Sequence, residues 1–277
     1  MCLPGTIEAV RESGATVSRR GLLAGTGAAA LAALLPGDAL AQAPKPKPGR
    51  NRGRVVDLTH EFTTDFPVYT PPQATRRTIA QLPGDGYYAQ EWTFGEHTST
   101  HMDAPGHFVQ GGRFVTQLKP AELVVPIVVV DITAKARRDP DAQVTPDDLR
   151  KWERKHGRIP DRALVAMNSG WAAKLGTPAF TGRDPGNVFH FPGFSEDAVE
   201  ALLEGRRASA IGVDTLSLDH GPAPVFVAHS KWLGADNYGI ECLNNLDKLP
   251  AVGATAVVGV IPWQEGSGGP ARVLATY

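Results

Sequence analysis

An almost unbroken apolar run, LVVPIVVVDI at residues 123–132, is the feature that most constrains the fold. A half-buried strand alternates apolar and polar residues, whereas this run is apolar at nearly every position. Such a run is typical of a strand that is covered on both faces, as in a sheet with layers packed on each side. The run therefore predicts a buried central strand.

Other short strand-like runs recur between Pro, Gly and Asp residues. They lie at 55–58, 87–94, 163–167, 210–213, 254–261 and 271–276. Two helices are predicted, one capped by Thr145 with Pro146 at its first position, the other capped by Ser195 and ending at Gly205. Because strands outnumber helices, the fold class is α/β or α+β with a large mixed sheet.

The charge balance narrows the classes of partner. The formal net charge of the 277 residues is −1, and no basic stripe with interleaved aromatic residues occurs. The sequence therefore predicts no nucleic-acid partner and no attraction to an anionic membrane. Cys2 and Cys242 are the two cysteines, so a mature chain that has lost Cys2 has no internal disulfide.

The N-terminus has the pattern of an export signal. Arg19 and Arg20 precede an Ala- and Gly-rich apolar stretch, and small residues follow at Ala39 and Ala41. This order indicates a twin-arginine signal peptide over residues 1–43. A membrane anchor is the alternative, but about 15 apolar residues are too few to span a bilayer comfortably. We expect a periplasmic or secreted protein with no membrane contact after cleavage.

The rest of the chain divides simply. Residues 44–54 are rich in Pro, Lys and Arg and are predicted to be a flexible leader. Residues 55–277 contain neither an internal repeat nor a long low-complexity stretch. A single catalytic domain is the simplest interpretation.

The stretch GEHTSTHMDAPGHF carries the strongest functional signal. His97, His101, Asp103 and His107 supply imidazole and carboxylate groups, which bind divalent metals. His97 and His101 would stand roughly 13 Å apart in an extended strand and about 6 Å apart in a helical turn. Pro105 disfavours a helix before it. We therefore predict a tight turn at a strand end, with His107 returning to the same pocket; a solvated polar loop is the alternative.

A second cluster lies in AHSKWLGADNYGIECL. His229 and Glu241 are too far apart in sequence for one helix or strand to bring them together. Together they have the residue types that would complete a two-metal site, with Asp103 as the bridge. Asp214 and Asp219 are interpreted as buried turn-forming residues, and His60 as a structural histidine.

HTSTHMDAPGHF resembles the H-x-G-T-H-x-D-x-P-x-H motif of the metal-dependent cyclase family, which includes bacterial kynurenine formamidase and isatin hydrolase. The segments VVDLTHEF, FPVY, MNSGW, FPGFSEDAVEALLE, IGVDTLSLD and GSGGPARVLA resemble the family in the same order. The resemblance covers nearly all of the mature chain. It implies a cyclase-like α/β single domain of the swivelling β/β/α type, commonly a homodimer or homotetramer.

The resemblance also implies roles for single residues. His97, His101 and Asp103 would bind metal, His229 and Glu241 would complete a second metal position, and the catalytic acid/base would be His107. The metal would be Zn²⁺ or Mn²⁺, as one or two ions.

Two departures from the family pattern concern the turn and the substrate. Ser99 stands where the family usually has Gly; a Ser restricts positive φ, and its hydroxyl could bond a ligand carboxylate. MNSGW lacks the Arg and Thr of the family's R-T-G-W segment, which lies near the substrate in family members.

The predicted activity is hydrolysis of a small cyclic amide or N-formyl arylamide by metal-activated water. Candidate residues for an aromatic wall against the substrate are Trp92, Phe108, Trp171 and Trp232. The alternatives are a lactone or cyclic imide hydrolase, and an exported metal- or ligand-binding protein without turnover. A metalloprotease is disfavoured because H-E-x-x-H is absent.

Overall fold

The computed structural model describes residues 53–277. The predicted signal peptide and nearly all of the predicted leader lie outside these residues, so both remain predictions. Arg54, at the end of that leader, exchanges backbone hydrogen bonds with Tyr277. The described residues group into two compact units, each with more contacts inside itself than to the other. The described part of one is Thr78–Gln90, and the other comprises Gly53–Arg77 and Glu91–Tyr277.

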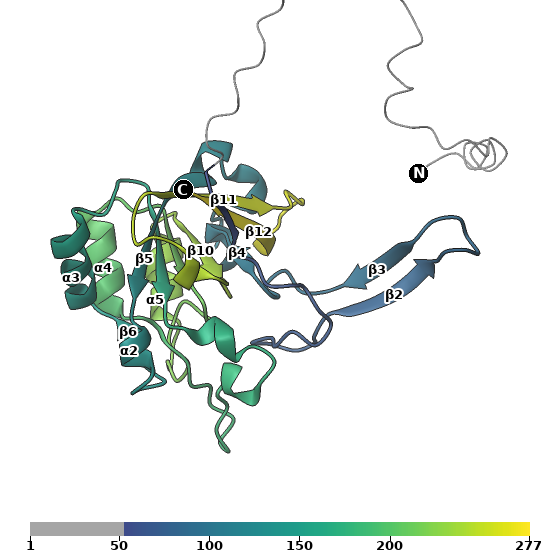
Figure 1. The fold of residues 1–277 in the computed structure, drawn as a ribbon, viewed down its shortest axis with the longest axis horizontal. Coiled ribbons are helices and arrows are strands. Elements are labelled where there is room, and N and C mark those ends of the chain that lie inside the picture. The colour runs from purple at the N-terminus through teal and green to yellow at the C-terminus, as the bar shows by residue number, and fades with distance from the viewer. Residues whose placement is uncertain (1–52) are drawn as a thin grey trace, which may run out of the picture. The chain divides into compact units, whose positions relative to one another are not determined.

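The strands and helices carry the labels of Figure 1. The strands are β1 (Val55–Asp57), β2 (Thr75–Ala80), β3 (Ala89–Thr93), β4 (His101–Asp103), β5 (Val124–Asp131), β6 (Gln143–Val144), β7 (Leu164–Asn168), β8 (Gly193–Phe194), β9 (Ala210–Val213), β10 (Tyr238–Glu241), β11 (Ala254–Val260) and β12 (Gly268–Thr276). The helices are α2 (Thr133–Ala136), α3 (Pro146–His156), α4 (Glu196–Gly205) and α5 (Val227–Gly234). Short 3₁₀ helices are η1 (Pro105–His107), η2 (Val115–Gln117), η3 (Pro120–Glu122), η4 (Trp171–Lys174), η5 (Pro178–Phe180) and η6 (Leu246–Lys248).

One large mixed sheet organises the domain. Its strand order is β1-β12-β11-β5-β7-β9-β10-β4, and β4 also pairs with β12. This extra pairing closes the order from β12 to β4 into a barrel-like ring. Strands β5, β7, β9 and β10 run parallel, whereas β4, β11 and β12 pair antiparallel with their neighbours. The predicted α/β class with a large mixed sheet is therefore confirmed.

Strand β5 shows why the long apolar run was required. Ile127 and Val129 belong to the core cluster that the ring encloses. Val128 and Val130 point to the other face, into a second cluster with residues of α3, α4 and α5. Since burying one such side chain stabilises the fold by about 1.5–3 kcal/mol, both faces of β5 contribute. The predicted strand covered on both faces is confirmed.

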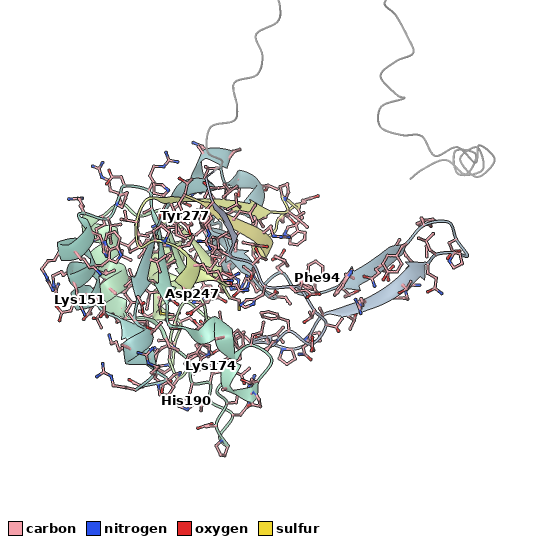
Figure 2. The ribbon with its side chains drawn as sticks, viewed as in Figure 1. Phe94, Lys151, Lys174, His190, Asp247 and Tyr277 are labelled. Carbon is pink, nitrogen blue, oxygen red and sulfur yellow. The ribbon has the colours of Figure 1, made fainter. Side chains whose placement is uncertain are left out.

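The two predicted helices form as their caps indicated. Thr145 caps α3 by accepting a hydrogen bond from the Asp148 backbone N–H, and Ser195 caps α4 in the same way. The polar face of α3 is turned away from the sheet, and Figure 2 shows Lys151 there. Helix α5 was not predicted. Within residues 53–277, no helix is both long and apolar enough to cross a bilayer.

Candidate functional site

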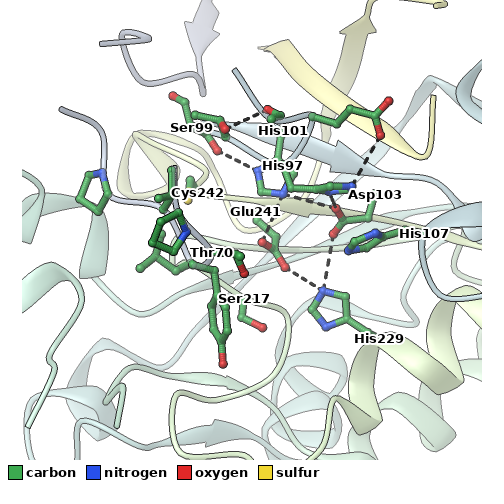
Figure 3. A pocket seen from close by; sticks show the side chains of 18 of the residues that line it. Thr70, His97, Ser99, His101, Asp103, His107, Ser217, His229, Glu241 and Cys242 are labelled. Atoms are coloured by element: carbon green, nitrogen blue, oxygen red, sulfur yellow. Dashed lines mark hydrogen bonds and ion pairs between the residues drawn. The ribbon is translucent and has the colours of Figure 1, made fainter. Parts of the chain in front are cut away.

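A cavity of about 480 Å³ contains the predicted metal-binding stretch (Figure 3). Its lining comes from residues 67–72, from the loop before β4, from β4 itself, from η1, from the loop after β9, from the start of α5 and from the end of β10. The lining includes seven residues expected at the site from the sequence: His97, His101, Asp103, His107, Phe108, His229 and Glu241. Segments that lie more than 100 residues apart in the chain therefore meet at one cavity.

The stretch from His97 to His107 bends twice, as its spacing indicated. Ser99 adopts a left-handed backbone with φ of 61°, after which residues 101–103 form β4. Thr100 Oγ1 donates to the carbonyl of Cys242 over 2.6 Å and accepts from the backbone N–H of His60 over 2.9 Å. These bonds hold the start of β4 beside the end of β10. Helix η1 then turns the chain so that His107 faces the same cavity.

The Asp103 carboxylate lies at the centre of the cluster. Its Oδ1 is 2.6 Å from His97 Nδ1 and 3.3 Å from His101 Nε2. Its Oδ2 is 3.7 Å from His229 Nε2. On the far side, the Glu241 carboxylate lies 3.3 Å from His101 Nε2 and 2.9 Å from His229 Nε2. Figure 3 shows these side chains converging.

Glycines on both neighbouring strands leave room for this cluster. Asp103 pairs with Gly239 of β10 on one side and with Gly268 of β12 on the other. A Cβ on Gly239 would approach Asp103 Oδ2 to 3.3 Å. A Cβ on Gly268 would lie 2.5 Å from His97 Cε1 and 2.3 Å from the Met102 carbonyl oxygen. The backbone is therefore close-fitting around the imidazoles and the carboxylate.

The donor set fits a divalent metal. Donor atoms of His101, Asp103 and Glu241 lie within 4.8 Å of one another, and so do those of His97, Asp103 and His107. Asp103 belongs to both groups. His101 Nε2 and Asp103 Oδ2 are buried and have no hydrogen-bond partner among the described residues. Buried polar atoms are rarely left unpaired, so a cation is the partner that this chemistry calls for.

Each histidine of the cluster is anchored through its other nitrogen. His101 Nδ1 is 2.9 Å from the Ser99 carbonyl oxygen, and His229 Nδ1 is 2.7 Å from Asp219 Oδ2. His97 Nε2 is 3.1 Å from the Ser267 hydroxyl. A proton on each anchored nitrogen leaves the inward nitrogen of a neutral ring free to bind metal.

Ser99 thus contributes its carbonyl oxygen, whereas its hydroxyl has no partner within residues 53–277. The expected bond from that hydroxyl to a ligand carboxylate is not formed.

The charges of the cluster are strongly coupled. Burial opposes the charged form of His229, but the carboxylates of Asp219 and Glu241 outweigh it and raise the pKa of His229 to about 10. Burial likewise opposes ionisation of Asp103, yet His101 and His97 hold its pKa well below the usual range. The three buried carboxylates of Asp103, Asp219 and Glu241 thus favour protons on His101 and His229, and a divalent cation supplies the same positive charge.

His107 differs from the other histidines of the site. Its ring stacks on that of His97 with centroids 3.7 Å apart. Burial lowers the pKa of His107 to about 4, and the neighbouring His97 and His229 act in the same direction. The ring is therefore neutral near pH 7, and it lies at the edge of the cluster, where it can accept a proton.

The aromatic side of the cavity differs from the expected set. Phe108 lines the cavity, but Trp92, Trp171 and Trp232 do not; the other aromatic lining residues are Tyr69 and Phe226. Trp171 and Trp232 are fully buried core residues whose indole N–H groups donate to backbone carbonyls. The proposed wall of tryptophans is therefore replaced by smaller rings. Tyr69 lies in the quoted FPVY segment, whereas Phe226 carried no signal in the sequence.

The MNSGW segment also lies elsewhere than expected. None of its residues lines the cavity. The backbone N–H groups of Ser169 and Trp171 donate to the buried Asp214 carboxylate. Asp214 therefore organises backbone, as interpreted, although its partners lie on a different strand end and not in its own turn. In this chain the segment packs in the interior of the fold and does not contact the cavity.

A comparison with family models decides the family. The Cyclase model matches residues 56–220, which is more than half of the chain. The chain belongs to the Cyclase family. The matched segment includes residues 97–107 but ends before His229 and Glu241. The assignment of those two residues to the site therefore rests on their positions in the structure.

The names of individual relatives of this Cyclase family member describe them as isatin hydrolases or as metal-dependent hydrolases. Isatin hydrolase from Roseibium aggregatum is 34% identical over 241 residues, covering 80% of this chain and 90% of that protein. An isatin hydrolase bound to the product analogue thioisatinate is similar in structure, with a TM-score of 0.77, 30% identity, and coverage of 82% of this chain and 93% of the other. A potential metal-dependent hydrolase with cyclase activity gives a TM-score of 0.61 at 25% identity, covering 80% and 96%.

Proposed function

We propose that this protein is a metal-dependent hydrolase that opens a cyclic aryl amide of the isatin type. The observation that carries the proposal is the buried convergence of three histidines and two carboxylates on one cavity. The similarity to isatin hydrolases over four-fifths of the chain supports the same substrate class.

In this proposal His97, His101 and Asp103 hold a divalent ion, and His229 and Glu241 complete a second position that Asp103 shares. When bound, the ion supplies Lewis acidity for the amide carbonyl and for water. Imidazole and carboxylate donors without a thiolate suit Zn²⁺ and Mn²⁺. We propose one of these two metals, as one or two ions.

His107 is proposed to move the proton. Its neutral ring can accept a proton from the attacking water and deliver it to the leaving nitrogen. In the overall reaction a C–O bond forms at the carbonyl carbon while the C–N bond breaks. The nitrogen gains a proton, so opening of isatin gives an aryl amine that carries a glyoxylate carboxylate.

The cavity suits a flat aromatic substrate. Phe108 stacks on the His229 ring, with centroids 4.8 Å apart, and contacts Phe226 edge-on. Tyr69 also packs edge-on against Phe226, at 5.5 Å between centroids. These rings form an apolar wall beside the donor cluster, against which a flat bicyclic amide can lie.

The test combines metal analysis with a substrate panel on one preparation of the protein. Wild-type protein is expected to contain zinc or manganese and to hydrolyse isatin in preference to N-formyl arylamides, lactones and cyclic imides. His107→Ala should retain the metal and lose roughly two to four orders of magnitude in kcat. His156→Ala, at the C-terminal end of α3 and outside the cavity, is the matched control.

Other outcomes point to the alternatives. Metal-loaded protein that is inert on the whole panel would favour a binding protein without turnover. Preference for a lactone or cyclic imide would keep the metal chemistry and replace the substrate. Glu241→Ala should lower the metal stoichiometry; an unchanged stoichiometry would remove Glu241 from the ligands.

Export and assembly belong to the same proposal. The arginine pair and the Ala-rich stretch before Ala41 support export through the twin-arginine route to the periplasm or beyond. Replacing Arg19 and Arg20 by Lys should retain the protein in the cytoplasm in a fractionation assay. A homodimer or homotetramer is proposed from the family resemblance, and light scattering of the mature protein tests it.

A further inference from the structure

Asp219 makes more contacts than a turn-forming residue needs. It is buried, with 3% of its surface exposed. Its Oδ1 accepts a hydrogen bond from the backbone N–H of Ala228 over 2.7 Å. Its Oδ2 lies 3.1 Å from the backbone nitrogen of His229 and 2.7 Å from Nδ1 of the same residue.

Two of these bonds cap a helix. Ala228 and His229 lie in the first turn of α5, where backbone N–H groups have no partner inside the helix. Phe226, the residue at the cap position, offers no side-chain bond. The Asp219 carboxylate satisfies both N–H groups from a distant loop, and a negative charge is favourable at a helix start.

The third bond is not required for capping. Asp219 Oδ2 already accepts from the backbone N–H of His229, and the same oxygen faces Nδ1, so Nδ1 is the ring nitrogen that donates and carries the proton. In the neutral ring, Nε2 then has a free lone pair, and this atom lies 2.9 Å from Glu241 Oε1 and 3.7 Å from Asp103 Oδ2. The ring plane and the helix start are thus fixed by one carboxylate group.

We infer that Asp219 is a positioning residue of the metal centre, which holds His229 in the orientation and tautomer that present Nε2 to the ion. This inference rests on the proposed function, because His229 must be a ligand. Among the anchors of the histidine rings, Asp219 is the one that bonds a ring with a carboxylate; His101 uses a carbonyl oxygen and His97 a hydroxyl. A carboxylate partner makes the metal-bound imidazole a stronger donor.

Asp219→Asn is the sharpest variant because it keeps the size of the side chain. An Asn has one accepting oxygen and one donating NH₂ group. If the oxygen caps Ala228, the NH₂ group faces His229 Nδ1 and drives the proton to Nε2. If the oxygen faces His229, the NH₂ group meets the Ala228 N–H instead. The variant therefore loses either the bond to the His229 ring or the bond to the Ala228 N–H.

The experiment measures metal affinity by competition with a chromophoric chelator, using Zn²⁺ and Mn²⁺ as probes. Asp219→Ala, which offers the ring no acceptor, is expected to bind metal 10- to 100-fold more weakly, and Asp219→Asn is expected to do the same when its NH₂ group faces the ring. Ser195→Ala is the control, since it removes the cap of α4 and leaves the cluster untouched; it should lower the melting temperature and keep wild-type affinity.

Each result decides the inference. Wild-type affinity in Asp219→Ala, together with a loss of stability like that of Ser195→Ala, would show Asp219 to be a helix cap alone, because Ala offers the ring no acceptor in any orientation. Wild-type protein that binds neither metal would overturn the proposed metal centre and this inference with it.

If Asp219→Ala does not fold, ¹⁵N NMR of histidine-labelled, Zn²⁺-loaded wild-type protein tests the same point. His229→Gln identifies the signal. A proton on Nδ1 of His229 is expected, and a proton on Nε2 would refute the inference.

Discussion

Replacing Ser99 by Gly should stabilise the protein, although it alters the centre of the metal-binding stretch. Ser99 has a φ of 61°, and a left-handed backbone costs a residue with a Cβ about 1–2 kcal/mol. Its hydroxyl is buried without a partner in the described part of the chain, which costs about 1–3 kcal/mol. The greater freedom of Gly in the unfolded chain offsets about 0.4–1 kcal/mol.

The net gain for Ser99→Gly is about 3 kcal/mol, which corresponds to a rise of about 6–12 °C in melting temperature for a domain of this size. Ser99→Ala is the matched variant, because it removes the hydroxyl and keeps the Cβ. It should gain about 2 kcal/mol, which is the cost of the buried hydroxyl alone. Differential scanning calorimetry of chelator-treated protein measures both.

Two results would refute this reasoning about Ser99. If Ser99→Gly is no more stable than Ser99→Ala, the left-handed backbone stores no strain. If both variants are no more stable than wild type, the hydroxyl has a partner in solution.

Three further predictions concern neighbouring parts of the structure. Gly268→Ala should weaken metal binding in a metal titration and destabilise the fold by about 1–3 kcal/mol, because its Cβ would lie 2.5 Å from His97 Cε1. The control is Gly259→Ala, whose Cβ meets an ordinary contact at 3.4 Å. It should bind metal normally in the same metal titration. Burial lowers the pKa of His60 to about 4, below its unfolded value, so this group's contribution to stability is complete above pH 6.5 and is lost as the pH falls toward 4. Urea titrations should show that His60→Phe removes up to about 3 kcal/mol of the wild-type loss over this window, and an unchanged pH dependence would contradict the buried neutral ring. Trp232→Phe should cost about 1–3 kcal/mol of stability and leave KM for isatin unchanged, whereas a raised KM would return this residue to the substrate wall.

The parts of the fold that were predictable have local causes. The apolar run of β5 and the caps Thr145 and Ser195 act within a few residues, so their patterns can be read directly from the chain. Helix α5 has no such signal, because its cap, Asp219, comes from a separate loop. The three residues of β4 are also too few for a periodic pattern, and they form a strand because β10 and β12 pair with both edges.

The tryptophans show where residue type misleads. Trp171 and Trp232 have the size and the ring that suit an aromatic substrate, but the same properties suit a core. Both indole N–H groups find backbone carbonyl partners inside the fold, which removes the cost of burying them. The smaller rings of Tyr69 and Phe226 reach the cavity because they lie in loops at its edge.

The sequence by itself determined the composition of the site. The spacing from His97 to His107 indicated a bent segment rich in metal donors, and the distant pair His229 and Glu241 completed the set of residue types. Tertiary structure alone decided which nitrogen of each ring faces inward. That choice depends on the outer partner of the ring, and partners such as Asp219 become neighbours only when the sheet closes and buries them together.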